Sequence, residues 1–326
     1  MDSKTKTEFS PETIQKLVES QFGSSTLVEK ITPLTDGWFN TAYDLQVLGE
    51  QADMILRIAP DPEQRVLTYE REMMRKEILI YQTIETLQDV PAPRLLASDT
   101  SRTIIARDYM FTEKFSGKPY DKIKENLSRK TVQSIEKEIG VYAARMHTHI
   151  GDAFGYFGDG PGSGSQNWRG AFLAFIDALL RDSEALEVQL PLDFSQLHDL
   201  FHKYAEALEE ITEASLVHWD MWAGNIFVIP ENGVYRVEGI IDWERALWGD
   251  PEIETAICCK FYGQSFFDGY GRDMLDGDDA KIRQCMYRLY LWLIMLTEEK
   301  VRFEGAAHIP WVREQLDHDL KLLQIF

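Results

Sequence analysis

Apolar residues in the first 113 positions recur mainly at the two-residue spacing of strands, interrupted by two segments at helical spacing. The first of these is predicted to be a helix over residues 11–21, because Ser10 can cap its N-terminus and Pro11 suits its first position. The second is a longer helix predicted over residues 68–86. Strands are predicted over residues 27–34, 43–47, 54–59, 94–97 and 104–111.

Helical spacing dominates the rest of the chain. A glycine-rich stretch, 151–170, interrupts it, and the aromatic residues between its glycines favour an ordered loop near a cleft. Helices are predicted over residues 130–150, from 168 onward, and over 280–298 and 310–323. A further helix is predicted to carry His198 and His202 and to continue over 204–211.

The clearest chemical pattern lies in this second half. His218 is followed by Asp220, and Asn225 comes five residues after that aspartate. The dipeptide Asn232-Gly233 then predicts a tight hairpin between two apolar segments, the second of which leads to Asp242. Such a hairpin would bring Asn225 and Asp242 together. Hard oxygen ligands of this kind suit Mg²⁺, so the pattern predicts a magnesium site.

Composition and charge narrow the possible partners. With 326 residues, 44% of them hydrophobic, the chain can form a large core or two lobes around a cleft. The net charge of −20 argues against a nucleic-acid partner, because phosphate backbones need basic surfaces. Residues 151–326 carry 31 acidic and 14 basic residues, which would attract a cationic ligand. General solubility is the alternative explanation.

The sequence predicts a cytoplasmic protein without a membrane partner. Its longest apolar run is far shorter than the ~20 residues that span a bilayer. The first seven residues lack the apolar region of a signal peptide. Three cysteines, without C-x-x-C spacing, fit a reducing compartment.

In protein kinases, the pattern H-R-D-x-x-x-x-N precedes D-F-G. Here Trp219 replaces the arginine, and the segment Ile241-Asp-Trp-Glu244 replaces D-F-G. Over roughly residues 27–260, the chain thus resembles the aminoglycoside phosphotransferase and choline kinase superfamily, and not the eukaryotic protein kinases. The resemblance implies an α+β, bilobal, protein-kinase-like fold. Residues 1–113 would form a nucleotide-binding lobe with an antiparallel sheet plus one helix, and residues 114–326 a mostly helical catalytic and substrate-binding lobe.

The resemblance also implies ATP or GTP together with Mg²⁺ in the cleft. Asp220 would orient the substrate hydroxyl and accept its proton, and His218 would support the catalytic loop through hydrogen bonds. Asn225 and Asp242 would hold the magnesium ion.

Further nucleotide contacts are implied in the first lobe. Gly37 and Asn40 belong to a loop that resembles the one covering the phosphates, although a hairpin turn would look the same. Arg57 would hold the phosphates and pair with Glu77, with Glu72 as the alternative partner. From strand chemistry alone, Arg57 could instead face water from an edge strand. The backbone of the hinge would hydrogen-bond the purine ring at Thr112, Glu113 and Lys114.

The resulting hypothesis is an O-phosphotransferase that phosphorylates a hydroxyl of a small molecule, most plausibly a cationic antibiotic of aminoglycoside or macrolide type. A kinase of an amino alcohol, a sugar or an amino-acid-derived hydroxyl is the first alternative, since fold does not determine substrate. A nucleotide-binding pseudokinase ranks lower. Loss of Asp220, Asn225 or Asp242 would have favoured it, and all three residues are present. The protein would act as a monomer or dimer.

Several other polar residues have less specific interpretations. His147 and His149 are expected to cap a helix or lie at the surface. His198 and His202 have a spacing that could bind a metal on one helix face, but the glutamate of H-E-x-x-H is missing, so a solvated face is expected. Two acids follow the motif. Asp250 is expected to tie the loop after Asp242 to neighbouring backbone, and Glu254 stands where the family that the chain resembles usually has an aspartate, so its role is left undefined.

Overall fold

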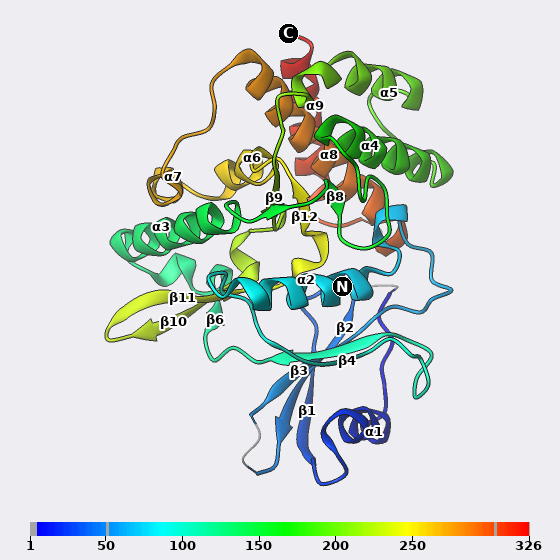
Figure 1. The fold of residues 1–326 in the computed structure, drawn as a ribbon, viewed down its shortest axis with the longest axis vertical. Coiled ribbons are helices and arrows are strands. Elements are labelled where there is room, and N and C mark those ends of the chain that lie inside the picture. The colour runs from blue at the N-terminus through cyan, green and yellow to red at the C-terminus, as the bar shows by residue number, and fades with distance from the viewer. Residues whose placement is uncertain (1–4, 50–51, 303–304, 326) are drawn as a thin grey trace.

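The computed structural model describes residues 5–49, 52–302 and 305–325. Residues 1–4 of the N-terminal segment considered above lie outside this part of the chain. Figure 1 shows a sheet-containing lobe below and a helical lobe above, with α2 (Met73–Leu87) between them. The lower lobe holds an antiparallel sheet in the order β1-β2-β3-β5-β4. These strands are β1 (Val28–Leu34), β2 (Thr41–Val47), β3 (Met54–Ile58), β4 (Leu95–Asp99) and β5 (Tyr109–Glu113).

The two faces of this sheet pack against different helices. Alternate side chains point to opposite sides of a strand, and those of Leu56 and Phe111 pack against α1 (Pro11–Phe22). On the other face, Met110 joins the cluster that contains residues of α2. Arg57 follows Leu56 and is paired in register with Met110, so this alternation directs it toward α2 and the other lobe.

The helix predicted over residues 68–86 is broken near its start. A 3₁₀ turn, η1 (Thr68–Glu70), precedes α2, and Glu72 between them has a left-handed backbone with φ 53°. The buried Glu70 carboxylate accepts the backbone N–H of Leu67 at 2.7 Å and forms an ion pair with Arg302 of α8. These tertiary contacts stabilise the break and override the local helical pattern.

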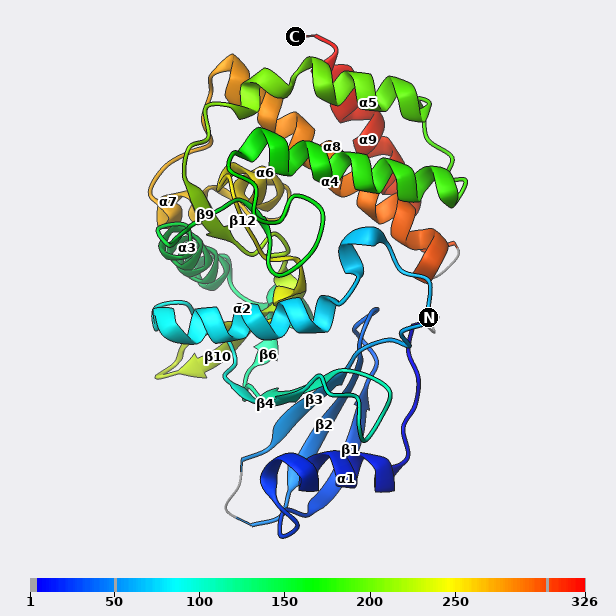
Figure 2. The same cartoon turned by 45° about the vertical axis from the view of Figure 1, so that its right-hand side comes forward.

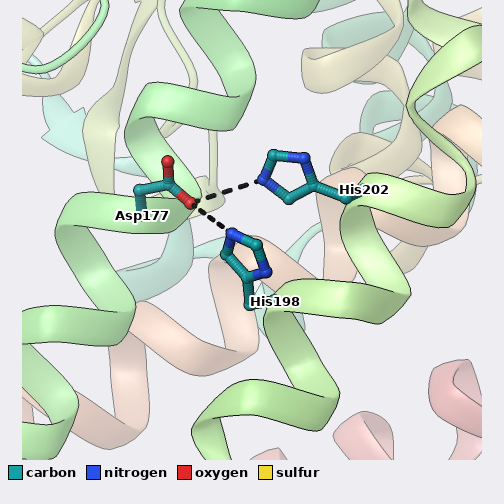
Figure 3. A group of neighbouring side chains, drawn as sticks. All are labelled: Asp177, His198 and His202. Atoms are coloured by element: carbon teal, nitrogen blue, oxygen red, sulfur yellow. Dashed lines mark ion pairs between the residues drawn. The ribbon is translucent and has the colours of Figure 1, made fainter.

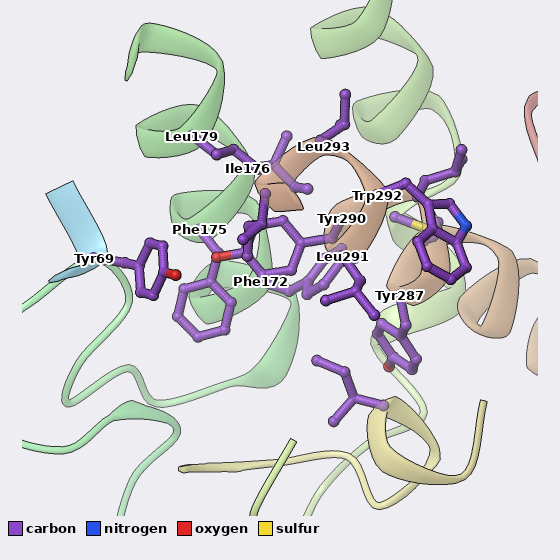
Figure 4. Close-up of a cluster of buried hydrophobic side chains, with 14 of the residues drawn as sticks. Tyr69, Phe172, Phe175, Ile176, Leu179, Tyr287, Tyr290, Leu291, Trp292 and Leu293 are labelled. Carbon is purple, nitrogen blue, oxygen red and sulfur yellow. The ribbon is translucent and has the colours of Figure 1, made fainter. Parts of the chain in front are cut away.

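The helical lobe surrounds α8 (Asp278–Arg302), which is buried along most of its length. Figure 4 shows aromatic rings of α4 packed on those of α8. Phe172 lies edge-on to Tyr287 at 5.2 Å between centroids, and Phe175 stacks on Tyr290 at 5.9 Å. The other helices are α3 (Arg129–Met146), α4 (Trp168–Ala185), α5 (Phe194–Lys203), α6 (Glu252–Phe261), α7 (Gln264–Tyr270) and α9 (Ile309–Leu323). The segment predicted as a helix over 204–211 contains only a 3₁₀ turn, η4 (Ala205–Leu208).

Two small sheets at the junction of the lobes carry the polar motif. One pairs β6 (Lys118–Pro119) with β10 (Ile226–Glu231) and β10 with β11 (Val234–Ile240). The other has the order β7-β9-β12-β8, formed by β7 (Ile150–Gly151), β9 (Ala214–Val217), β12 (Leu247–Gly249) and β8 (Gly155–Tyr156). Further 3₁₀ turns are η2 (Tyr120–Lys122), η3 (Lys124–Asn126), η5 (Ala223–Asn225) and η6 (Trp243–Arg245).

The order of elements confirms the predicted α+β fold, with an antiparallel sheet first and a mostly helical part afterwards. The glycine-rich stretch forms an ordered loop in which Phe154, Tyr156 and Phe157 are buried. Beside it, a hollow of about 450 Å³ is bordered by residues 150–158, Gly164 and Trp248. In the described ranges, none of the helices has the length and apolar character needed to cross a membrane.

Candidate active site

A buried carboxylate of α6 holds the loop that follows β9. Glu254 is 1% exposed and accepts the backbone N–H groups of His218 at 2.9 Å and Trp219 at 3.1 Å. Trp219 has a left-handed backbone with φ 60°, which is strained for a bulky residue. Its buried indole stacks on Tyr290 at 5.1 Å between centroids, and this packing with the Glu254 bonds offsets the strain.

His218 connects the two halves of the motif. Its Nε2 lies 3.0 Å from the carbonyl of Ile241, and its Nδ1 accepts the backbone N–H of Asp220 at 3.1 Å. Because Nδ1 is an acceptor, Nε2 carries the proton and the ring is neutral. Complete burial lowers the pKa of His218, which keeps this tautomer. The ring thus connects the loop to the strand that leads to Asp242 and orients the backbone of Asp220.

Asp220 lies at the centre of the loop with both oxygens engaged. The amide nitrogen of Asn225 donates to its Oδ2 at 3.0 Å and to its backbone carbonyl at 2.9 Å. Arg245 Nη1 lies 3.9 Å from Oδ1, and the Nη2 of the same side chain donates to Glu298 of α8 at 2.7 Å. Burial raises the pKa of Asp220 to about 7; Arg245 opposes this shift, and the nearby carboxylates of Asp242 and Glu298 add to it.

The predicted hairpin forms between Asn225 and Asp242. Asn232 and Gly233 both have positive φ, at 50° and 80°, as a two-residue turn of this kind requires. Ile226 pairs with Ile240, and the N–H of Ile241 donates to the carbonyl of Asn225 at 2.9 Å. The pairing brings the two expected metal ligands to the same end of the hairpin.

The donor set at this end fits Mg²⁺. The amide nitrogen of Asn225 is bound to Asp220, which leaves its amide oxygen for a ligand. Asp242 has a left-handed backbone with φ 66°, and Arg57 binds only one of its carboxylate oxygens, Oδ1, at 2.8 Å. Carboxylate and amide oxygens with room for water are the environment that Mg²⁺ prefers.

Arg57 brings both lobes together at the site. It forms an ion pair with the fully buried Glu77 of α2 and lies 3.6 Å from Glu244 in addition to its bond with Asp242. β3 lies between β2 and β5, so Arg57 is not on an edge strand. The alternative partner Glu72 precedes α2 and lies 4.0 Å from Arg75 instead. Burial and the neighbouring Asp242 and Glu77 raise the pKa of Glu244 well above its usual range.

Of the two residues expected in the phosphate loop, Asn40 is buried beside the site and Gly37 is exposed. Asn40 is buried and donates to Glu244 at 3.3 Å, so it lies beside the Arg57 cluster. Gly37 is exposed in the loop between β1 and β2, and no heavy atom lies within 4 Å of the position that a Cβ would occupy. The structure thus links Asn40 to the other site residues, whereas Gly37 contacts none of them.

The three residues expected at the hinge, Thr112, Glu113 and Lys114, differ in which of their polar groups already have partners. Thr112 and Glu113 belong to β5, and the N–H of Glu113 donates to the carbonyl of Arg94 at 2.9 Å. That N–H is therefore unavailable for a purine ring. Lys114 follows the strand, and its ammonium group lies 2.9 Å from Asp44.

Sequence reasoning missed several residues that support the site. Arg245 had no assigned role, and Glu254 had a place in the family pattern but no defined role. Only their position close after the motif could have indicated one. His147 is the C-cap residue of α3, one of the two expected alternatives, and it is buried. Its Nδ1 lies 2.8 Å from the Tyr270 hydroxyl and its Nε2 lies 3.8 Å from Glu254. Asp250 binds the backbone N–H of Glu252, as expected of a loop contact, and also two side chains of α8, Tyr287 and Arg283.

Comparisons with solved structures support the same fold. The chain is similar to a thermostable mutant of aminoglycoside phosphotransferase APH(4)-Ia in ternary complex with ADP and hygromycin B, with 20% identity, a TM-score of 0.62, and coverage of 95% of this chain and 98% of the other. It is also similar to APH(2″)-IIa in its streptomycin–ATP complex, with 14% identity, a TM-score of 0.60 and coverage of 98% of both chains. The GDP and kanamycin complex of APH(2″)-IIIa gives 14% identity, a TM-score of 0.58, and coverage of 96% and 97%.

The sequence matches none of the curated proteins. The model of one family, described as the phosphotransferase enzyme family, does match it over residues 30–289, which includes the strands of the first lobe and the whole polar motif. With the kinase-like fold and the convergent site, this match shows that the chain is a small-molecule kinase belonging to the phosphotransferase enzyme family.

Proposed function

We propose that the protein transfers the γ-phosphoryl group of ATP or GTP to a hydroxyl of a small molecule. The observation that carries the proposal is the convergence of Asp220, Asn225 and Asp242, with the Arg57–Glu77 ion pair beside them. Phosphoryl transfer depends mainly on positioning and electrostatic stabilisation, and this site supplies both. The nucleotide would lie between the lobes, residues 1–113 and 114–326.

In the proposed mechanism, Asp220 orients the acceptor hydroxyl and accepts its proton. The acceptor oxygen forms a bond to the γ-phosphorus, the bond between that phosphorus and the β,γ-bridging oxygen breaks, and ADP or GDP leaves. A pKa of about 7 places this carboxylate near the operating pH. At such a pH, a large fraction of the carboxylate is deprotonated and the group is still basic enough to accept a proton. Asn225 fixes the carboxylate through Oδ2, and His218 holds the loop beneath it. Arg57, held by Glu77, would neutralise charge on the phosphates.

The nucleotide would be held by both lobes. Asn225 and Asp242 would bind Mg²⁺, which, when present, neutralises charge on the phosphates. Asn40 and Gly37 would lie near the phosphates in the loop between β1 and β2. At the hinge, the backbone of Lys114, which follows β5, is the candidate for contacts with the base. The Glu113 N–H already has a partner, and Thr112 is paired with Ile55 and Leu95 inside the sheet.

For the acceptor, we propose a cationic antibiotic of aminoglycoside or macrolide type. The excess of acidic residues in the second half of the chain favours a cation. Two of the similar structures contain streptomycin and hygromycin B as ligands, which supports the aminoglycoside class by analogy alone. A primary metabolite with an amino alcohol, sugar or amino-acid-derived hydroxyl is the second candidate, because the same site would handle any hydroxyl.

A phosphorylation screen tests the proposal. The full-length chain is incubated with Mg²⁺ and ATP or GTP, and aminoglycosides, macrolides, amino alcohols and sugars are assayed for phosphorylated product by mass spectrometry. Turnover of a metabolite with no antibiotic phosphorylated would refute the antibiotic assignment and leave the reaction class intact. Mg²⁺-dependent nucleotide binding without ATP hydrolysis or product would instead indicate a pseudokinase.

A further inference from the structure

Two helices of the second lobe bring three potential metal ligands together, away from the site described above. Asp177 lies on α4, and His198 and His202 lie on α5 (Figure 3). Both helices are at the end of the molecule opposite the five-stranded sheet (Figure 2). Within the described residues, these side chains form the one group of three whose ligand atoms all lie within 4.8 Å of one another.

Local helix geometry explains why the two histidines share a face. Residues four apart on a helix are neighbours on its surface, and the rings of His198 and His202 stack with 4.1 Å between centroids. The sequence pattern alone indicated a solvated pair. The tertiary structure adds the third group, because α4 packs alongside α5 and presents Asp177 to both rings.

The carboxylate of Asp177 faces the two rings without a hydrogen bond. Its Oδ1 lies 3.8 Å from Nε2 of His198 and 3.7 Å from Nε2 of His202, which is too long for a hydrogen bond. This oxygen is buried and accepts no hydrogen bond from any described residue. An oxygen acceptor that is shielded from solvent and lacks a donor is unfavourable, so a cation shared by the three groups would stabilise the arrangement.

A neighbouring residue orients one of the rings for such a role. Nδ1 of His198 lies 3.2 Å from the Asp199 carboxylate. A ring that donates from Nδ1 to a carboxylate keeps the lone pair of its Nε2 for a ligand, and metal-binding histidines are commonly held in this way. The lone pair of Nε2 then points to the same space as Asp177 Oδ1.

We propose that Asp177, His198 and His202 form a binding site for a divalent transition metal of the Zn²⁺ type. Two imidazoles and one carboxylate are a ligand set that suits such ions, with water completing a tetrahedral shell. Bonds of about 2.0 to 2.1 Å separate tetrahedral ligand atoms by roughly 3.3 Å, so Asp177 Oδ1 must approach each ring nitrogen by a few tenths of an ångström. The two stacked rings must also turn so that both Nε2 atoms face the ion. The metal would link α4 to α5 and stabilise that part of the lobe. It takes no part in the proposed phosphoryl transfer.

The test measures metal binding directly in the full-length protein after treatment with a chelator. Co²⁺ serves as a spectroscopic probe, because tetrahedral nitrogen and oxygen coordination gives visible absorption bands, and Zn²⁺ is titrated by calorimetry. The expected result is one saturable site per chain and a rise in Tm on adding Zn²⁺. Removing either ring, by His198→Ala or His202→Ala, should abolish the Co²⁺ bands, and Asp199→Asn should weaken Zn²⁺ binding by about tenfold.

Two controls distinguish this site from general metal binding. His318→Ala removes an exposed histidine of α9 and should leave affinity and spectrum unchanged. Since the ligands are at least one-third exposed, the variants should fold, and circular dichroism of each verifies this. Unsaturable binding, octahedral Co²⁺ spectra, or equal Zn²⁺ affinity in the wild type and the His198→Ala/His202→Ala double variant would each overturn the proposal. These readouts do not depend on the phosphoryl-transfer reaction.

Discussion

Replacing Asp220 by asparagine should increase stability while it removes activity. Asp220 is held near the carboxylates of Asp242 and Glu298, and its burial raises its pKa to about 7. The folded protein therefore bears a cost for keeping this group charged above neutral pH. Asparagine has nearly the same shape, and its amide oxygen can still accept the bond from Asn225. The substitution thus removes the charge with little change in packing.

The magnitude follows from the shift of the Asp220 pKa. A rise from 3.8 to about 7 corresponds to an upper limit of about 4 kcal/mol, at 1.36 kcal/mol per unit. The side chain is 28% exposed, and solvent screening reduces the expected gain to about 1–2 kcal/mol at pH 8. Because the folded state binds this proton more tightly than the unfolded state, the gain grows as the pH rises from about 4 to about 7, is complete above that, and vanishes below about 4.

Urea unfolding of the wild type and Asp220→Asn at pH 4, 6 and 8 measures this difference. Asp317→Asn, at an exposed position of α9, serves as the matched control and should change stability little at any of these pH values. Loss of the general base should lower kcat by roughly 10²- to 10⁴-fold. An Asp220→Asn variant that is less stable than the wild type at pH 8, or whose turnover is within tenfold of it, would refute the reasoning.

Three further predictions concern the groups around Asp220. Glu77→Ala removes the most buried of the three carboxylates around Arg57, so we expect weaker nucleotide binding by calorimetry and a loss of about 1–3 kcal/mol in urea unfolding. The loss is smaller than for a wholly unpaired buried charge because Asp242 and Glu244 still contact Arg57. Unchanged values in both measurements would contradict the role of the pair. Glu254→Gln keeps a hydrogen-bond acceptor but removes the charge that strengthens the bonds to the loop N–H groups. The kcat should therefore fall about tenfold while the KM for nucleotide stays unchanged. A change in KM alone would argue against a positioning role for Glu254. For the wild-type enzyme, kcat/KM for the acceptor should fall about tenfold for each pH unit below pH 7, because Asp220 becomes protonated. A kcat/KM that stays constant between pH 5 and 7 would exclude Asp220 as the general base.

Local patterns predicted several elements because their causes are local. The first helix begins after Ser10, whose side chain accepts the N–H of Thr13, and Pro11 occupies its first position. The Asn-Gly hairpin between β10 and β11 required only residues that tolerate positive φ. The long helix predicted over 68–86 begins only at Met73, for a non-local reason: Glu70 binds Arg302, which lies more than 200 residues away, and this contact holds the break before α2.

The sequence by itself determined the catalytic motif, because His218, Asp220 and Asn225 lie within eight residues and their spacing is set by one loop and one strand. The tertiary structure alone decided which distant groups support that loop. Glu254 reaches its N–H groups from α6, and Arg245 is bound by Glu298 of α8. Such partners come from separate helices whose packing depends on the whole hydrophobic core, so no local spacing encodes them.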